Sequence, residues 1–275
     1  MASISSAPNT IRAGACPPRP SLLTGLPEQG VPLTALQATA GRTRIKICGL
    51  TREQDVDAAV AAGADAIGFV LYPASPRAVT MQRAAELARR LPAFVTPVLL
   101  FVNEPSAQVM AACAQVPGAI AQFHGDETPE QCLASTGGGE RSFLRAARIP
   151  LGDAALQFDL VEYAHRYSHA KAILLDAHVE GFGGGGKAFN WSLLPTNVAS
   201  HLVLSGGLTP ANVTDGIVQV RPRCISLAVD VSSGVEMTGA DGKAIKGTKD
   251  AEKIQQFVAA VRAADTLLAK NPFHV

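Results

Sequence analysis

The sequence predicts an α/β protein folded as a single closed (β/α)8 TIM barrel with a parallel eight-stranded sheet. From Arg42 onward, short apolar or β-branched runs alternate with alanine-rich helical stretches, and eight such runs occur. The crossovers are long enough to hold helices, and eight parallel strands are the number at which such a sheet closes on itself. An open doubly wound sheet would suit fewer strands and would place G-x-G-x-x-G after the first. This chain has Gly49-Leu50-Thr51-Arg52 there, so the barrel is favoured.

The predicted elements follow one another as strand and then helix. The strand candidates are residues 44–48, 66–70, 95–102, 119–123, 142–146, 172–176, 202–205 and 225–229. The helical patterns lie at residues 53–62, 81–90, 106–115, 130–133, 154–167, 210–218 and 250–268. The sixth helix is expected to be short and to begin near Trp191.

Residues 1–41 differ in composition from the rest. They hold six prolines, no lysine and one acid, Glu28. We interpret them as a disordered N-terminal extension, with the barrel domain at residues 42–270 and a short tail at 271–275. The arginines and serines would also suit a transit sequence, although this density of proline disfavours an amphipathic targeting helix.

The charge balance and the cysteines limit the class of protein. Lysine and arginine total 24 against 23 acids, which gives no electrostatic reason to expect nucleic acid or an anionic membrane as a partner. No apolar run approaches the roughly 18 residues of a membrane helix. Five cysteines at scattered spacings, with no C-x-x-C pair, suggest reduced thiols in a cytoplasmic protein without a structural metal. We expect a small-molecule enzyme.

Active-site groups of such barrels lie at the carboxyl ends of the strands. In the first strand, Ile45 and Ile47 should face the helices, while Lys46 and Cys48 face the interior. A thiol at the last inward position is a candidate catalytic group, and the neighbouring Lys46 ammonium would lower its pKa towards neutrality. The alternative is that Cys48 is only a small buried apolar residue.

The sixth strand ends in an inward carboxylate, Asp176, which would face Cys48 across the mouth. Residues 181–186 then contain five glycines, Gly184 among them. Glycine loses the most backbone entropy on ordering, so this run predicts a loop that closes over a ligand or approaches it closely. A plain flexible linker is the alternative.

The segments after strands seven and eight predict a phosphate site. Gly206 and Gly207 follow the seventh strand, and Asp230, Ser233 and Gly234 lie at the end of the eighth. Bare amides, hydroxyls and a helix N-terminus at these two loops surround phosphate groups in many barrels. The predicted partner is therefore a phosphorylated small molecule.

Two more side chains point towards the mouth. Arg77 follows a proline-framed loop after strand two, and its planar guanidinium would suit bidentate capture of a substrate carboxylate. A solvated surface arginine is the alternative. Gln122 and His124 lie on the inward parity of strand four; His124 is a candidate substrate contact or a hydrogen-bonded structural histidine.

Several segments together resemble one family, the phosphoribosylanthranilate isomerases of tryptophan biosynthesis. They are KICGLT at 46–51, IGFVLYPASPR at 67–77, FHGDE at 123–127, LLDAHVEGFGGGGKAFNW at 174–191, LSGGLTPANV at 204–213 and DVSSGVE at 230–236. The resemblance implies a cofactor-free Amadori rearrangement by a monomer or homodimer. It implies Asp176 as general acid, Cys48 as general base and Arg77 as the carboxylate ligand. The glycines after strands six and seven, with Ser233 and Gly234, would bind phosphate.

The chain departs from the family pattern at three places. Gly185 replaces a usual serine or threonine, Asn190 replaces a usual aspartate, and the segment after Glu236 is longer and more basic than expected. Two other interpretations are open: a related barrel acting on another phosphosugar, such as an epimerase or an indole-forming synthase, and a catalytically silent barrel that binds a phosphorylated metabolite. A synthase would need a lysine and a glutamate at strand ends, and Lys46 has no convincing glutamate partner. The presence of both an acid and a base argues against the silent barrel, since binding alone requires neither.

Overall fold

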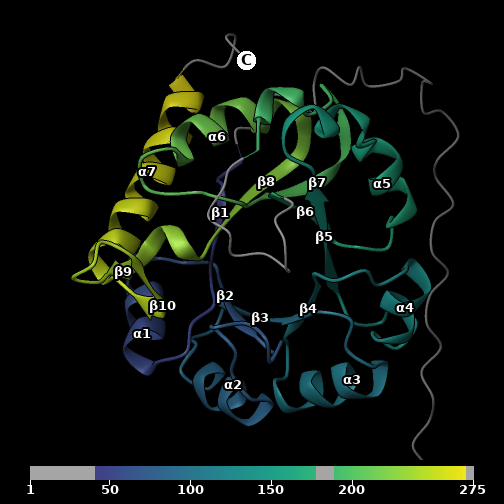
Figure 1. Cartoon of the computed structure of the whole chain (residues 1–275), viewed down its shortest axis with the longest axis vertical. Coiled ribbons are helices and arrows are strands. Elements are labelled where there is room, and N and C mark those ends of the chain that lie inside the picture. Colours follow the sequence, from purple (N-terminus) through teal and green to yellow (C-terminus); the bar gives the residue numbers. More distant parts are fainter. Residues whose placement is uncertain (1–40, 178–188, 271–275) are drawn as a thin grey trace, which may run out of the picture.

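The computed structural model describes residues 41–177 and 189–270, whose strands close into one barrel (Figure 1). The strands are β1 (Arg44–Cys48), β2 (Ala66–Val70), β3 (Thr96–Phe101), β4 (Ile120–Phe123), β5 (Phe143–Ile149), β6 (Ala172–Ala177), β7 (Val198–Leu204) and β8 (Cys224–Val231). Each strand pairs in parallel with the next, and β8 pairs with β1. The predicted (β/α)8 barrel is confirmed.

Helices surround this barrel in the order of the chain (Figure 1). They are α1 (Glu53–Ala62), α2 (Met81–Ala88), α3 (Ser106–Gln115), α4 (Pro129–Ala134), α5 (Leu160–Arg166), α6 (Val213–Val220) and α7 (Ala251–Lys270). Short 3-10 turns lie at η2 (Gly152–Gln157), η3 (Trp191–Leu193), η4 (Arg221–Arg223) and η5 (Ser233–Val235). The turn at η3 occupies the sixth crossover, where the sequence predicted a short helix near Trp191.

The prediction of one continuous helix over residues 154–167 is wrong. The segment divides into η2 and α5, because Asp159 adopts an extended backbone and caps a new helix. Its carboxylate accepts a hydrogen bond of 2.9 Å from the backbone N–H of Glu162. An aspartate at this position satisfies one of the free N–H groups of the first turn, so it starts a helix instead of continuing one.

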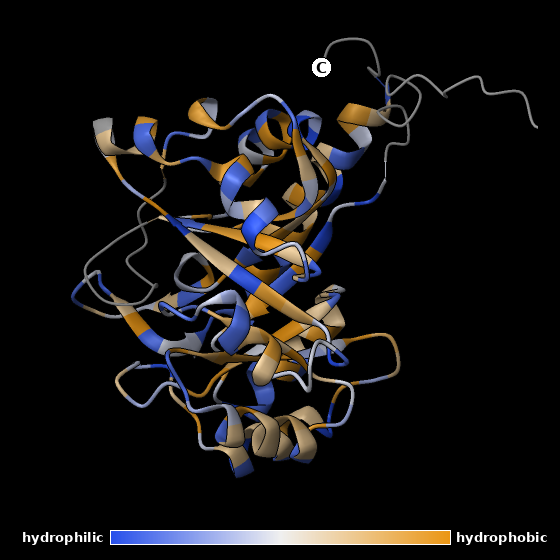
Figure 2. Cartoon of the chain, turned by 90° about the vertical axis from the view of Figure 1, so that its right-hand side faces the viewer, coloured by the Kyte–Doolittle hydropathy of each residue, from blue (hydrophilic) through white to orange (hydrophobic). Residues whose placement is uncertain are grey.

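The period-two pattern of the strands divides the core into two layers. Ile45 and Ile47 are fully buried between the barrel and the helices, as predicted. Inside the barrel a smaller apolar cluster, which includes Val98, Leu144 and Leu174, fills the interior. Figure 2 shows the strands largely in hydrophobic colours, while the helices carry both colours along their length. The polar groups of the site rest on this filled interior.

An antiparallel hairpin of β9 (Glu236–Thr238) and β10 (Ala244–Lys249) was not predicted. It occupies the long basic segment after Glu236 and lies beside α1 and α7 (Figure 1). Thr51 Oγ1, just before α1, donates a hydrogen bond of 2.8 Å to the carbonyl of Gly247. The hairpin is thereby attached to the mouth of the barrel.

Some predictions fall on residues that the structure does not describe. The N-terminal extension (apart from Gly41), the tail at 271–275 and the glycine-rich loop with Gly184 and Gly185 lie outside the described residues. Within the part that is described, no helix has the length and apolar character needed to cross a membrane.

Candidate active site

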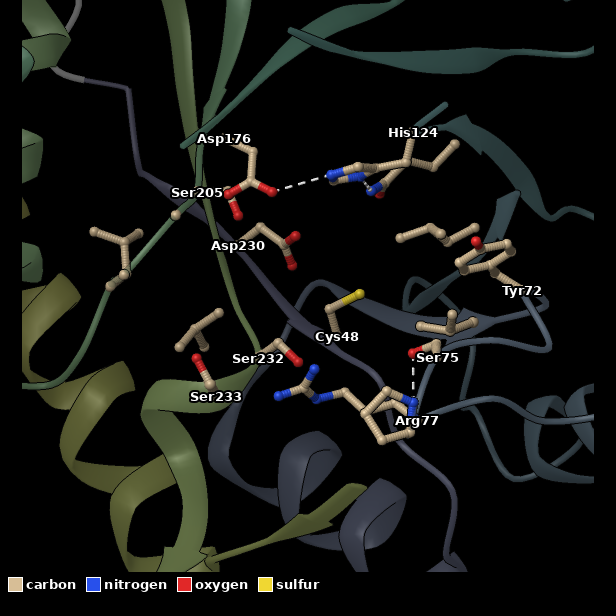
Figure 3. A pocket seen from close by; sticks show the side chains of 18 of the residues that line it. Cys48, Tyr72, Ser75, Arg77, His124, Asp176, Ser205, Asp230, Ser232 and Ser233 are labelled. Atoms are coloured by element: carbon tan, nitrogen blue, oxygen red, sulfur yellow. Dashed lines mark hydrogen bonds and ion pairs between the residues drawn. The ribbon is translucent and has the colours of Figure 1, made fainter. Parts of the chain in front are cut away.

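A cavity of about 290 Å³ opens at the carboxyl ends of the strands, where a barrel enzyme is expected to bind its substrate. It brings together eight of the predicted site residues from both halves of the chain: Cys48, Arg77, His124, Asp176, Gly206, Gly207, Asp230 and Ser233. Figure 3 shows the Cys48 thiol and the Asp176 carboxyl group directed into this one cavity. Gly234 does not line it, and Gly184 is not described.

The Cys48 thiol is buried beside an ion pair. Lys46 Nζ lies 2.9 Å from Asp230 Oδ1, and both side chains are buried. Burial raises the pKa of Cys48, the Lys46 ammonium lowers it and the Asp230 carboxylate raises it; the result is a pKa above the usual range of a thiol. The expectation that Lys46 brings this pKa towards neutrality is therefore wrong, because desolvation outweighs the ammonium and Asp230 compensates its charge.

The Asp176 carboxyl group has a defined partner on each oxygen. Oδ1 accepts a hydrogen bond of 3.0 Å from the backbone N–H of Ala177. Oδ2 lies 3.0 Å from His124 Nε2, and His124 Nδ1 lies 3.1 Å from Gln122 Nε2 (Figure 3). His124 is thus hydrogen-bonded at both ring nitrogens, with the candidate acid as one partner, and it also lines the cavity as a candidate substrate contact would.

Gly206 allows the loop after β7 to pass directly over Asp176. A Cβ atom at this position would lie 2.8 Å from Asp176 Oδ1 and 2.7 Å from the Ala177 nitrogen. The backbone also has a φ of +76°, a conformation that L side chains rarely adopt. The glycine that the sequence assigned to phosphate binding is therefore also required by the carboxyl group beneath it.

The two loops of the predicted phosphate site touch each other at Gly234. A Cβ atom there would lie 1.9 Å from the carbonyl oxygen of Leu208, in the loop after β7. No side chain fits this contact, since the neighbouring atom belongs to the backbone. Ser233 begins the short turn η5 next to it and lines the same cavity as Gly206 and Gly207 of the loop after β7.

Arg77 is buried and already holds an acid. Its Nε and Nη2 lie 2.6 and 2.9 Å from the two carboxylate oxygens of Glu236. Although burial raises the pKa of Glu236, this arginine and Lys249 keep it below its usual range. The solvated surface arginine considered above is excluded, since the residue is 6% exposed. One edge of the guanidinium is occupied, which leaves the edge between Nη1 and Nη2 for a ligand.

Sequence reasoning missed Glu236 and Lys249, which contact the lining residues Arg77 and Ser232. Both lie on the unpredicted hairpin, where an isolated acid and lysine read as surface residues. The available signal was spacing: Gly247 and Lys249 are the buried positions of β10 and alternate with more exposed ones, as in a half-buried strand. Three residues of that pattern are too few to identify a strand.

The closed parallel barrel and the cavity at its strand ends define an enzyme of the (β/α)8-barrel class. The family model described as N-(5'-phosphoribosyl)anthranilate (PRA) isomerase matches residues 45–260. The isomerase of Leptothrix cholodnii is 60% identical over 224 residues, which cover 82% of this chain and 93% of that protein. The chain therefore belongs to the N-(5'-phosphoribosyl)anthranilate isomerase family, and it is an isomerase of the aldose–ketose type.

Solved structures agree with this family. The phosphoribosyl anthranilate isomerase of Thermotoga maritima has a TM-score of 0.67 and 36% identity, covering 80% of this chain and 99% of that one. A second solved structure is a phosphoribosyl anthranilate isomerase in complex with reduced 1-(o-carboxyphenylamino)-1-deoxyribulose 5-phosphate. It has a TM-score of 0.65 and 34% identity, with coverage of 80% and 99%. The family indicated by the sequence motifs is confirmed.

Proposed function

We propose that this enzyme converts N-(5-phosphoribosyl)anthranilate into 1-(2-carboxyphenylamino)-1-deoxyribulose 5-phosphate, an Amadori rearrangement in tryptophan biosynthesis. Asp176 is the general acid and Cys48 the general base. The observation that carries the proposal is that these two groups, one on β1 and one on β6, line the same cavity. The reduced product bound to a related isomerase supports the choice of substrate.

The first step opens the sugar ring. Asp176 transfers a proton to the ring oxygen, the bond between that oxygen and C1 breaks, and the nitrogen lone pair forms an iminium ion with C1. Gln122 and His124 support both states of the acid. When Asp176 is ionised, His124 donates to it from Nε2 and receives the Gln122 amide N–H at Nδ1. When Asp176 is protonated, its O–H donates a hydrogen bond to Nε2 of the other histidine tautomer, and the oxygen of a rotated Gln122 amide accepts from Nδ1–H.

The second step removes the proton at C2. The thiolate of Cys48, which is the minor form of a thiol with a raised pKa, takes this proton. The C–H electrons then form a C1–C2 double bond, and the nitrogen regains its lone pair. The resulting enolamine becomes the ketone when C1 gains a proton and the hydroxyl at C2 loses one. The enzyme returns to its starting state when Cys48 loses its proton and Asp176 gains one. Electrons and atoms balance within the substrate, so the reaction needs no cofactor.

The two anionic groups of the substrate define how it lies. The anthranilate carboxylate binds the open edge of Arg77, which Glu236 holds by its other edge. The phosphate binds at the loops after β7 and β8, through Gly206, Gly207, Ser233 and Gly234, with Gly184 contributing from the glycine-rich loop. Asp230 fixes Lys46 next to Cys48 and faces the sugar hydroxyls.

The test is substrate turnover, followed by the loss of phosphoribosylanthranilate fluorescence. Cys48→Ala and Asp176→Asn should each lower kcat at least a hundredfold, since a positioned acid or base contributes about 10²–10⁴ in rate. Matched controls are Cys224→Ala, a thiol at the opposite end of β8, and Asp215→Asn, an exposed carboxylate on α6. Circular dichroism checks that every variant is folded. Wild-type rates in both site variants would disprove the assignment, and an inactive wild-type protein would disprove the reaction.

The catalytic domain is proposed to be residues 42–270. A protein without residues 1–41 should retain its kcat and KM within about twofold, because the acid, the base and both anion-binding ends lie in the barrel. A loss of activity on this truncation would show that the N-terminal segment contributes to the reaction.

A further inference from the structure

Lys249 is a fully buried lysine that the proposed reaction does not use. Its side chain has 0% exposure, and it ends β10 next to the mouth of the barrel. Burying an ammonium group is costly unless it is paired and hydrogen-bonded. The contacts of its Nζ therefore indicate what the residue does.

Those contacts reach both anion-binding ends of the cavity. On one side, Nζ donates a hydrogen bond of 2.9 Å to the carbonyl of Ser232 and lies 3.3 Å from its hydroxyl. Ser232 directly precedes Ser233, which begins the turn of the predicted phosphate site. On the other side, Nζ lies 3.4 Å from Glu236 Oε1, the oxygen that also binds Arg77 Nε. One ammonium group thus joins the phosphate loop to the acid that orients Arg77.

The position of this ammonium is itself fixed by the backbone of β10. The Lys249 N–H donates to Asp55 Oδ2 at 3.0 Å, and Asp55 at the start of α1 is paired with Arg52 at 2.6 Å. Two residues earlier on β10, the Gly247 N–H donates a hydrogen bond of 2.9 Å to Glu236 Oε1. The strand is therefore held at both ends of the cluster, and Nζ has little freedom to move.

The cluster carries one more positive than negative charge. Arg77 and Lys249 share the carboxylate of Glu236, and Arg77 lines the cavity, whose proposed ligand is anionic at both ends. The pKa of Lys249 is lowered to about 8: burial and the Arg77 guanidinium lower it, and the Glu236 carboxylate raises it. The charge of the cluster therefore depends on a group that titrates in an accessible range.

We infer that Lys249 is a positioning residue that sets the distance between the carboxylate-binding and phosphate-binding ends of the active site, by tying Glu236 and the Ser232 loop to one strand. The inference rests on the proposed function for the identity of the two anions. It assigns the unpredicted hairpin a role in substrate binding, whereas Cys48 and Asp176 carry out the chemistry.

Steady-state kinetics of Lys249→Met tests this role. The variant keeps the apolar stem but removes the ammonium, so KM should rise at least tenfold while kcat stays within threefold of the wild type. Lys246→Met is the matched control, because Lys246 is an exposed lysine on the same strand, and it should change neither constant. A fall in kcat at unchanged KM would overturn the inference, as would an unchanged KM in the folded variant.

Binding of two fragments tests the link between the ends without turnover. Inorganic phosphate reports on one end and anthranilate on the other, each by isothermal titration. The Kd of both should rise at least fivefold in Lys249→Met. A change confined to one fragment, or to neither, would overturn the inference. Because these titrations need no catalysis, they decide the inference even if the wild-type protein binds both fragments and shows no turnover.

A third measurement does not require the Lys249 variant to fold. The groups that face Lys249 are Glu236 from β9, Arg77 from the loop after β2 and Cys48 from β1, with Asp55 of α1 at its backbone. In Cys48→Ala, which removes the thiol, the Kd of anthranilate should rise more than threefold between pH 7.5 and 9.0. The ligand carboxylate is ionised throughout this range. A constant Kd would overturn the inference.

Discussion

Gly206→Ala tests whether the loop after β7 must pass directly over Asp176 in addition to binding phosphate. The added Cβ atom would lie 2.8 Å from Asp176 Oδ1, whereas an unstrained contact needs about 3.5 Å. The carboxyl group must therefore retreat by at least about half an ångström. Since a misplacement of about 1 Å can cost about a hundredfold in rate, we expect kcat to fall on the order of tenfold. The measurement is turnover at saturating substrate, together with a thermal melt.

Gly118→Ala is the matched control for the backbone. Its φ of +79° is close to the +76° of Gly206, and no described atom lies within 4 Å of its Cβ position. Both variants should lose about 1–2 kcal/mol of stability from the left-handed conformation, which lowers Tm by about 2–8 °C. Only Gly206→Ala should lose kcat. A folded Gly206→Ala with kcat within twofold of the wild type would refute the reasoning, and so would an equal loss in Gly118→Ala.

Two further predictions follow from burial. The rate of Cys48 alkylation by iodoacetamide, measured by mass spectrometry, should rise about tenfold per pH unit from pH 7 to 9 without levelling off, because the raised pKa of Cys48 keeps most of it a thiol in this range. Lys46→Met should slow the alkylation further, because it removes the cation that lowers the pKa of Cys48. A plateau below pH 8 would contradict this. Phe123→Ala removes a fully buried ring that packs against Phe143, with the ring centroids 5.6 Å apart. This variant should lower the free energy of unfolding, measured in urea, by about 3–5 kcal/mol. Leu267→Ala, at a half-exposed position, should change it by less than about 0.5 kcal/mol. Equal losses in both variants would argue against the packing explanation.

The barrel and the inward side chains could be predicted because they depend on local periodicity. Lys46 and Cys48 are two residues apart on β1, and Gln122 and His124 are two residues apart at the end of β4, with His124 directly after it. A pleated strand sends both members of such a pair to the same face. The closed order of the strands then places Asp176 at the same mouth. Neither inference requires knowledge of which side chains touch.

The pairings of those side chains could not be predicted. Arg77 binds Glu236 across 159 positions of the chain, and Lys46 binds Asp230 across 184. No local pattern encodes such a contact, and each pairing changes the chemistry inferred for its members. One edge of the Arg77 guanidinium is occupied by Glu236 and is closed to a ligand. Burial, with the Asp230 carboxylate that pairs with Lys46, outweighs the expected lowering of the Cys48 pKa by Lys46.

The ion pair between Lys46 and Asp230 sits on the seam of the barrel. The two residues are register partners on β1 and β8. The strand β1, which supplies the base, therefore gains its second neighbour only when β8, the last of the eight strands to be synthesised, is in place. A nascent chain that still lacks β8 leaves Lys46 without its carboxylate and the ring of strands open. Catalytic competence should therefore arise in a single late event when the ring seals, and not build up gradually as the polypeptide lengthens.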